Sequence, residues 1–211
     1  MQVRPFRVRD TAAVYDVCLR TGDDGADSSG QTADPRLFGD VWVGSYLALS
    51  PGPAMVLQDD EGVAGYTVAA LDTVEFDAAC EATWWPPLRS RHQRPVGTPE
   101  GWTLDQRLAH LVHSPPRTPR WIVDDHPSHL HIDLLPRIQG GGHGAALMET
   151  MVDALRGAGS PGVHLGVGSA NERARRFYRR NGFTELSADP ETVWMGRRLA
   201  PHRRPPACGP G

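Results

Sequence analysis

The sequence predicts an α/β fold, because strand-like and helix-like patterns alternate along most of its 211 residues. The clearest unit lies at residues 129–157. Apolar and polar residues alternate over 129–134, which is typical of a strand with two unlike faces. Pro136 ends this strand, because it lacks the backbone amide that a central strand needs. Apolar residues then recur at helical spacing over 147–155, and Gly157 ends the run.

Weaker patterns predict the other elements. Before the central unit, strands are expected at 3–7, 54–58 and 63–71, with a hairpin turn at 59–62, and helices at 36–48, 74–85 and 104–112. Asp10 is expected to cap a helix that carries Val14 and Cys18. After the unit, a strand is expected at 163–167. A short helix follows, opened by a capping box of Ser169 and Glu172 and closed by Asn181-Gly182 in a left-handed turn, with Phe183 folded back on it.

Composition indicates an ordinary globular chain. A hydrophobic fraction of 39% can bury one sizeable core. We expect one domain over 1–200, with a helical insertion at about 73–120 and a flexible tail at 201–211. The tryptophans of the insertion either wall a substrate pocket or cover a core edge, and we favour the second. The net charge of −3 predicts neither a nucleic-acid nor a membrane partner. An odd number of scattered cysteines and the lack of an apolar leader favour the cytoplasm.

A glycine-rich turn, Gly140 to Gly144, joins the central strand to its helix. Glycine permits positive φ, and the helix start offers unpaired amides, so the turn suits a phosphate. A Walker loop requires a lysine, and the chain contains none. A dinucleotide fingerprint requires an acidic residue after the next strand, which is missing near Val167. A flexible linker is the remaining alternative, but strand and helix patterns flank the run directly.

The turn also meets a third pattern, Gln/Arg-x-x-Gly-x-Gly/Ala, from Gln139 to Gly144. This resembles the pyrophosphate loop of the Gcn5-related N-acetyltransferases (GNAT). Further along, Asn171, Ala174, Tyr178 and Gly182-Phe183 resemble the second signature of that superfamily. Both signatures lie within about 121–185, and their order and spacing are more specific than either alone. More narrowly, residues 129–137 with Phe177-Tyr178 look like bacterial relatives of the acetyltransferase-like domain that ends animal O-GlcNAcases. The animal domain lacks an intact glycine loop, whereas this chain keeps one.

The resemblance implies a mixed central sheet that is splayed around acetyl-CoA, with helices on both faces. It implies that the cofactor is bound by thirteen residues: Leu134, Leu135, Arg137, Gln139, Gly140, Gly141, Gly142, His143, Gly144, Ala145, Asn171, Phe177 and Tyr178. A backbone amide at Leu134 or Leu135 would polarise the thioester carbonyl. The hydroxyl of Tyr178 would protonate the departing thiolate.

Three polar residues, His129, His131 and Asp133, share one face of the central strand. A histidine beside a carboxylate can accept the proton of an incoming amine, and this is the role we expect. Two alternatives stay open. His131 and Asp133 also fit the His-x-Asp of an iron facial triad, although that site needs a distant second histidine, and we expect no metal. All three side chains could instead be structural polar groups.

The loop at 21–30 holds the carboxylates Asp23, Asp24 and Asp27, which are either a solvated surface or the attraction for a cationic amine. We therefore expect an acetyl-CoA-dependent N-acetyltransferase that acts directly on a primary amine of a small molecule, aminosugar or peptide. The alternative is a catalytically silent acetyl-CoA-binding protein that acts as sensor or scaffold. A homodimer stays open.

Overall fold

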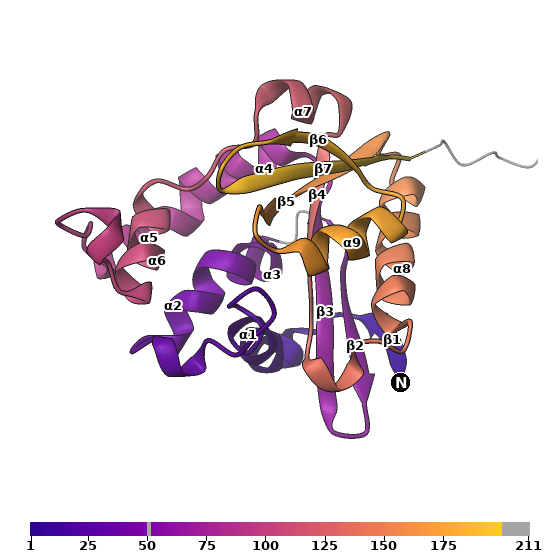
Figure 1. Cartoon of the computed structure of the whole chain (residues 1–211), viewed down its shortest axis with the longest axis horizontal. Coiled ribbons are helices and arrows are strands. Elements are labelled where there is room, and N and C mark those ends of the chain that lie inside the picture. The colour runs from indigo at the N-terminus through magenta and orange to yellow at the C-terminus, as the bar shows by residue number, and fades with distance from the viewer. Residues whose placement is uncertain (50–51, 200–211) are drawn as a thin grey trace, which may run out of the picture.

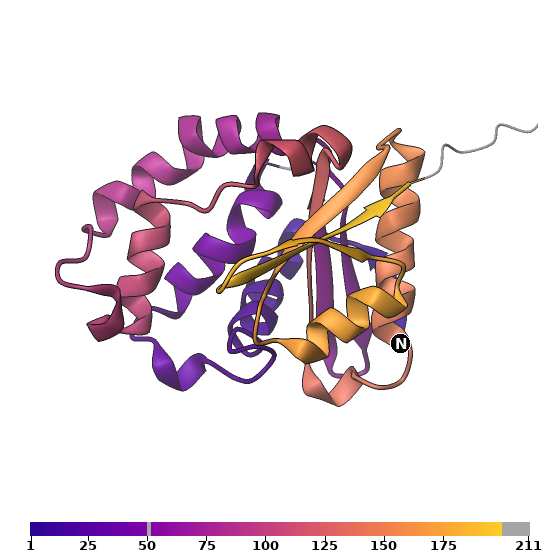
Figure 2. The ribbon, with the colours of Figure 1, turned by 45° about the horizontal axis from the view of Figure 1, so that its top comes forward.

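The computed structural model describes residues 1–49 and 52–199, and it confirms the predicted mixture of strands and helices. Seven strands form one mixed sheet in the order β1-β2-β3-β4-β5-β7-β6. The strands are β1 Gln2–Pro5, β2 Ala54–Asp59, β3 Gly62–Ala70, β4 Ser128–Leu134, β5 Gly162–Gly168, β6 Thr184–Ala188 and β7 Thr192–Arg198. The helices are α1 Thr11–Leu19, α2 Pro35–Gly39, α3 Ser45–Leu49, α4 Thr73–Ala79, α5 Trp85–Arg91, α6 Leu104–His113, α7 Arg120–Asp125, α8 His143–Gly157 and α9 Glu172–Arg180. Figures 1 and 2 show α1 and α8 on opposite sides of β2 and β3.

The predicted hairpin and central strand are confirmed. β2 and β3 pair antiparallel, and Asp59 opposite Gly62 closes their turn, where Gly62 has φ +120°. β4 pairs with β3 from Ala70↔His129 to Gly65↔Leu134. Its apolar side chains Leu130 and Ile132 are buried in the core, as the alternation predicts.

The sheet opens between β4 and β5. These strands are parallel neighbours, but they pair only at Ser128↔Val163 and His129↔His164. β5 then continues along β7 as far as Gly168↔Thr192 and leaves the second half of β4 without a partner on that side. The amide of Leu135 donates to Ala64 O on the β3 side at 2.8 Å. Because amides alternate in direction along an antiparallel strand, the amide of Leu134 points into the opening.

One expected helix boundary between β3 and β4 is wrong. A helix ending before Pro86-Pro87 was expected, but α4 continues through a π-helical turn, Cys80–Trp84, into α5. Pro86 and Pro87 stand at the first positions of α5, directly after the π-helical turn. This wider turn accommodates the backbone amides that the two prolines lack. Trp85 is buried, and the indole of Trp84 donates to Asp40 O at 3.0 Å. The division into a domain with an insertion stays a prediction, and the expected tail at 201–211 lies outside the described residues.

Two expected N-caps are wrong. Asp10 does not cap α1 with its side chain. Its carboxylate instead accepts from the Arg7 amide and the Arg4 guanidinium. These two donors occupy the oxygens that a cap of α1 would use. At α9, Asn171 is the cap, accepting from the Ala174 amide at 2.9 Å.

The expected capping box fails because the Ser169 hydroxyl donates to Pro190 O, 2.6 Å away. The C-terminal prediction for α9 is confirmed. Gly182 has φ +78°, and the Phe183 amide donates to Tyr178 O at 3.1 Å. β6 and β7, which follow this motif, were not expected.

Candidate active site

A cleft of about 1020 Å³ lies where β4 and β5 separate. The second half of β4 and Gly166 to Gly168 of β5 form its floor, while the glycine turn, α9, α1 and the loop after α1 form its walls. Twelve of the residues expected from the sequence line this cleft: Asp24, His131, Asp133, Leu134, Gln139, Gly140, Gly142, Gly144, Ala145, Asn171, Phe177 and Tyr178. Segments that are more than a hundred residues apart in the sequence therefore meet at one opening.

Seven expected residues do not line it: Asp23, Asp27, His129, Leu135, Arg137, Gly141 and His143. Leu135 is 2% exposed, and its amide is already used on the β3 side. The Arg137 guanidinium pairs with Asp59 of the β2–β3 hairpin at 2.8 Å. In the loop after α1, Asp23 accepts from Gln31, and Asp27 accepts the Ser29 amide. The three charged side chains among these residues, Arg137, Asp23 and Asp27, thus bond to partners outside the cleft.

The glycine turn has the form that an anion site needs. Gly140 and Gly142 have φ +84° and +79°, which side chains rarely tolerate. Gly142 is also the N-cap residue of α8 and makes no side-chain cap, so the first amides of α8 are not occupied by a cap. A Cβ atom placed on either glycine would meet nothing within 4 Å. The turn therefore offers open space and backbone donors, which fits a pyrophosphate.

Gln139 connects the turn to both walls. Its Nε2 donates to Leu134 O at 2.7 Å, and its Oε1 accepts from Arg173 Nη1 at 2.5 Å. The carbonyl of Leu134 is thus occupied, while its amide faces the cleft. Gln139 holds the end of β4, the glycine turn and α9 in one arrangement.

Asp133 is the centre of a compact polar group in the cleft. Its Oδ2 accepts from the Tyr66 hydroxyl at 2.6 Å and bonds to His131 Nε2 at 3.0 Å. Burial disfavours the imidazolium of His131, but the charge and hydrogen bond of Asp133 more than offset this and raise the pKa of His131. His131 is therefore more basic than an ordinary histidine, which suits a proton acceptor.

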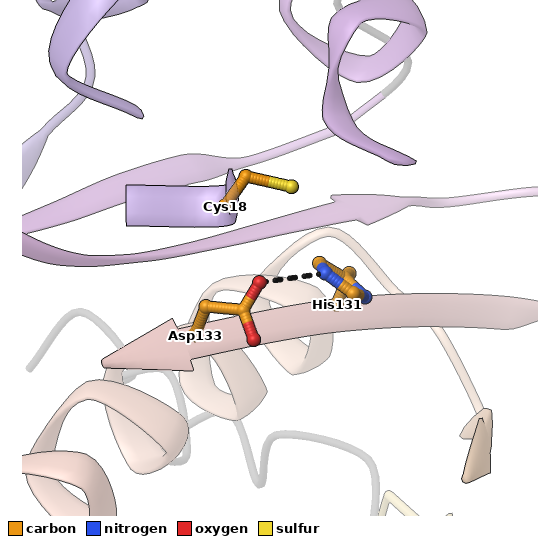
Figure 3. Close-up of side chains that lie close together, drawn as sticks. All are labelled: Cys18, His131 and Asp133. Atoms are coloured by element: carbon orange, nitrogen blue, oxygen red, sulfur yellow. Dashed lines mark hydrogen bonds and ion pairs between the residues drawn. The ribbon is translucent and has the colours of Figure 1, made fainter. Parts of the chain in front are cut away.

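The structure adds a thiol that the sequence did not indicate. Cys18 of α1 lies beside His131 and Asp133, with the three potential donor atoms within 4.8 Å of one another (Figure 3). Burial, and then the charge of Asp133, raise the pKa of the Cys18 thiol, so it stays protonated. An iron facial triad would need a second histidine here, and among the described residues Cys18 is the third member instead.

His129 belongs to a different environment. Its Nδ1 bonds to the Thr73 hydroxyl at 2.8 Å, and its ring packs against Tyr46 and Phe76. Burial lowers the pKa of His129 to about 3. A ring that holds a proton so weakly and does not line the cleft has the properties of a structural side chain.

Tyr178 lies on the wall of the cleft formed by α9. Its ring packs edge-on against Phe177 and Phe183, with centroid distances of 5.4 and 5.8 Å. Burial, with a contribution from the charge of Asp133, raises the pKa of the Tyr178 hydroxyl. The hydroxyl is therefore protonated over the whole physiological range and can act as a donor.

The loop after α1 contacts α9 directly. Asn171 Nδ2 donates to Asp24 Oδ1 at 3.0 Å. The Oδ1 atom of the same side chain accepts from the Ala174 amide and so caps α9. Asp24 itself has φ +49°, the left-handed conformation that Asp tolerates. Of the three loop carboxylates, Asp24 is thus the one at the cleft, and it is tied to Asn171.

The residues of this site that sequence reasoning missed include Cys18, Trp42, Tyr66 and Arg173. Cys18, Trp42 and Arg173 line the cleft, and Tyr66 lies behind Asp133. Trp42 is 37% exposed and was expected only as part of an apolar helix face. Tyr66 faces the site because it pairs directly with Asp133 across β3 and β4. That strand register was the signal that could have found it.

Comparison with known proteins assigns the fold and the family. The family model described as the acetyltransferase (GNAT) family matches residues 34–183. The chain belongs to the GNAT family. Across the described residues, this GNAT chain contains no helix that is long and apolar enough to cross a membrane.

Individual relatives agree with this assignment. The GNAT chain is 26% identical over 201 residues to Protein O-GlcNAcase of Rattus norvegicus and of Mus musculus, a match that covers 93% of the chain. It spans only 22% of the length of those proteins. The crystal structure of SsHAT is 40% identical, has a TM-score of 0.85 and is matched over 94% of this chain and 98% of its own.

The structure of yncA from Salmonella typhimurium, with its cofactor acetyl-CoA, shares the fold at a TM-score of 0.57 and 18% identity. The match covers 99% of each chain. The family and the open glycine turn together make acetyl-CoA the cofactor of this GNAT chain.

Proposed function

We propose that this chain transfers an acetyl group from acetyl-CoA directly to a primary amine of a small molecule, aminosugar or peptide. The observation that carries the proposal is the convergence of Tyr178, the His131–Asp133 pair and the glycine turn on the cleft between β4 and β5. When bound, acetyl-CoA supplies an acetyl group activated as a thioester. The residues of the chain have three tasks there: to bind, to polarise and to move protons.

Binding is the task of the glycine turn. The amides at the start of α8 and the positive end of its dipole would hold the pyrophosphate. The amide of Leu134, which points into the opening, is the donor we assign to the thioester carbonyl, because the amide of Leu135 is occupied by Ala64 O. Of the two amides expected from the sequence, only the Leu134 amide is free on the cleft side.

His131 is the group that we assign to accept the proton of the amine. Asp133 stabilises the imidazolium that forms and orients the ring, while Tyr66 fixes the carboxylate of Asp133 from the other side. Tyr178 is the group that we assign to protonate the thiolate that would leave from acetyl-CoA; burial keeps its hydroxyl protonated and available for that role. In this scheme Asp24 attracts the cationic amine toward the cleft.

A thiol-release assay tests the proposal. Wild-type protein, saturating acetyl-CoA and a panel of amines, aminosugars and peptides should give free CoA with at least one acceptor above the rate of spontaneous hydrolysis. Release that is equal with and without acceptors, in a protein that acetyl-CoA stabilises thermally, would favour the silent acetyl-CoA-binding protein instead.

A further inference from the structure

α1 and β4 bring a thiol, an imidazole and a carboxylate together in the cleft. Cys18 lies on α1, while His131 and Asp133 lie on the same face of β4. Their potential donor atoms all lie within 4.8 Å of one another (Figure 3). We call these three side chains the thiol cluster. The proposed acetyl transfer uses His131 and Asp133, but it gives the thiol of Cys18 no task.

The donor atoms of the thiol cluster are of the kinds that zinc prefers. Magnesium and calcium favour sites built from oxygen, whereas a sulfur beside an imidazole favours zinc. Cys18 as a thiolate and Asp133 as a carboxylate each bring a negative charge, and the neutral ring of His131 brings none. The charge of the ligands would therefore balance that of Zn²⁺, which a partly buried site requires.

The spacing of the donor atoms is close to that of a zinc site. His131 Nε2 and Asp133 Oδ2 are 3.0 Å apart. With metal–ligand distances of about 2.0 to 2.3 Å, neighbouring donors of a tetrahedral zinc site lie about 3.3 to 3.6 Å apart. Donors that start within 4.8 Å of one another reach this arrangement through movements on the order of 1 Å.

The surroundings of the thiol cluster also suit a metal ion. The Tyr66 hydroxyl donates to Asp133 Oδ2 at 2.6 Å, and an outer partner of this kind orients a ligating carboxylate. Cys18 is only 1% exposed, whereas the side chains of His131 and Asp133 are 34% and 21% exposed. All three line the cleft, so an ion can reach them from that side, where water can complete its coordination.

We propose that the thiol cluster binds Zn²⁺ and that the bound zinc inhibits acetyl transfer. As the bond between zinc and the Cys18 sulfur forms, the thiol proton passes to the solvent, and nothing is oxidised or reduced. Zinc on His131 occupies the lone pair that we assign to the amine proton, so zinc acts as an inhibitor and not as a cofactor. The inhibition rests on the proposed function, whereas the binding of zinc does not.

Titration of the full chain with Co²⁺ tests the binding without any turnover, because the absorption of cobalt reports thiolate ligands and tetrahedral geometry. Wild-type protein should develop a thiolate-to-cobalt charge-transfer band together with the visible bands of tetrahedral cobalt, and Zn²⁺ should then abolish both. Cys18→Ala should lose the charge-transfer band. Cys80→Ala and Cys208→Ala, which replace the other cysteines of the chain, are matched controls and should keep it. Circular dichroism of each variant would verify that it is folded.

Inhibition is measured with an accepted amine, as acetylated product by mass spectrometry, because zinc also binds the thiol of free CoA. Zn²⁺ should slow wild-type protein, a chelator should restore its rate, and Mg²⁺ should have no effect. Relative to its own rate without zinc, Cys18→Ala should need more than about ten times as much Zn²⁺ for half-inhibition, because it lacks one ligand. Cys80→Ala should match wild type.

The outcomes separate this inference from the proposed function. A wild-type protein without the charge-transfer band, or a band that persists in Cys18→Ala, would overturn the zinc site and leave acetyl transfer intact. Equal sensitivity of wild type and Cys18→Ala to Zn²⁺ would overturn the inhibition through this site. If no acceptor is acetylated even without zinc, the proposed function is wrong, and the cobalt spectra still decide whether the thiol cluster binds metal.

Discussion

The carboxylate of Asp133 connects the protein interior to the cleft. One of its oxygens accepts from the buried Tyr66 hydroxyl and also bonds to His131, and the thiol of Cys18 lies alongside. Burial alone would lower the pKa of His131, as it does for His129. The charge and the hydrogen bond of Asp133 therefore decide which of the two histidines has a raised pKa.

Replacement of Asp133 by Asn should therefore move the acidic limb of the pH–rate profile. His131 must be neutral to accept a proton, so activity rises as pH rises through its pKa. Because Asp133 raises this pKa, wild-type activity should reach half its maximum above about pH 6.5, the ordinary value for histidine. In Asp133→Asn, burial is unopposed, and the limb should shift to lower pH while turnover falls by a factor of roughly 10 to 100. Tyr66→Phe, which keeps the charge, is the control. If the acidic limb of Asp133→Asn lies at the same pH as that of wild type, a group other than His131 titrates there.

Tyr178→Phe tests the assigned acid. The change removes only the hydroxyl and leaves the ring packed between Phe177 and Phe183, so stability and the affinity for acetyl-CoA should change little. At saturating acetyl-CoA, turnover should fall by a factor on the order of 10². Unchanged turnover would remove Tyr178 from the chemistry.

At the scale of elements, the site depends on two interruptions of regular structure. β4 and β5 pair over only two residues and then separate, which opens the sheet. Directly after β4, Pro136 and the glycines redirect the chain so that the start of α8 faces this opening. The same short segment thus supplies an amide from the strand and amides from the helix.

Gly142→Asp should abolish the thermal stabilisation by acetyl-CoA. The aspartate brings a side chain and a negative charge to the start of α8, where we place the pyrophosphate. Gly159→Asp is a matched control, because Gly159 follows the other end of α8 and also has positive φ and open space around it. Both variants should lose intrinsic stability through backbone strain, but only Gly142→Asp should lose the ligand-induced shift in Tm. Equal shifts in the two variants would place the pyrophosphate elsewhere.

Asn171 should prove to be structural as well as close to the cofactor. Asn171→Ala removes the cap of α9 and the bond to Asp24, so the free energy of unfolding should fall by about 1 to 2 kcal/mol in urea denaturation. Asn171→Ser keeps a capping oxygen and should recover part of this loss. A loss of the same size in both variants would mean that the cap contributes nothing.

At the scale of the whole molecule, local patterns predicted the hairpin, the central strand, the turn and α8 well. Each of these depends on neighbouring residues: alternation, a proline, glycines and helical spacing. The C-terminal end of α9 was predicted for the same reason. The caps of α1 and α9 were not, because distant or competing partners such as Arg4 and Pro190 take the side chains that were expected to cap.

The site was predictable where a motif defines it and not where the fold assembles it. The glycine turn, Tyr178 and the His131–Asp133 pair follow from sequence spacing, and all contribute to the cleft. Cys18 and Trp42 reach it from helices near the N-terminus, and no local pattern indicates such contacts. His129 shares a strand face with His131, but its partners come from α3 and α4, so the alternation alone could not separate the two histidines.

We propose that acetyl transfer from acetyl-CoA to an amine takes place in the cleft. Mass spectrometry of a reaction with deuterium-labelled acetyl-CoA and an amine panel measures this directly. We expect labelled N-acetyl product and free CoA to appear in equal amounts with wild-type protein, and neither to appear with Gly142→Asp. If the wild type binds acetyl-CoA to saturation but no labelled amine, aminosugar or peptide forms, the chain is not an acetyltransferase for these acceptors, and the proposed function is wrong.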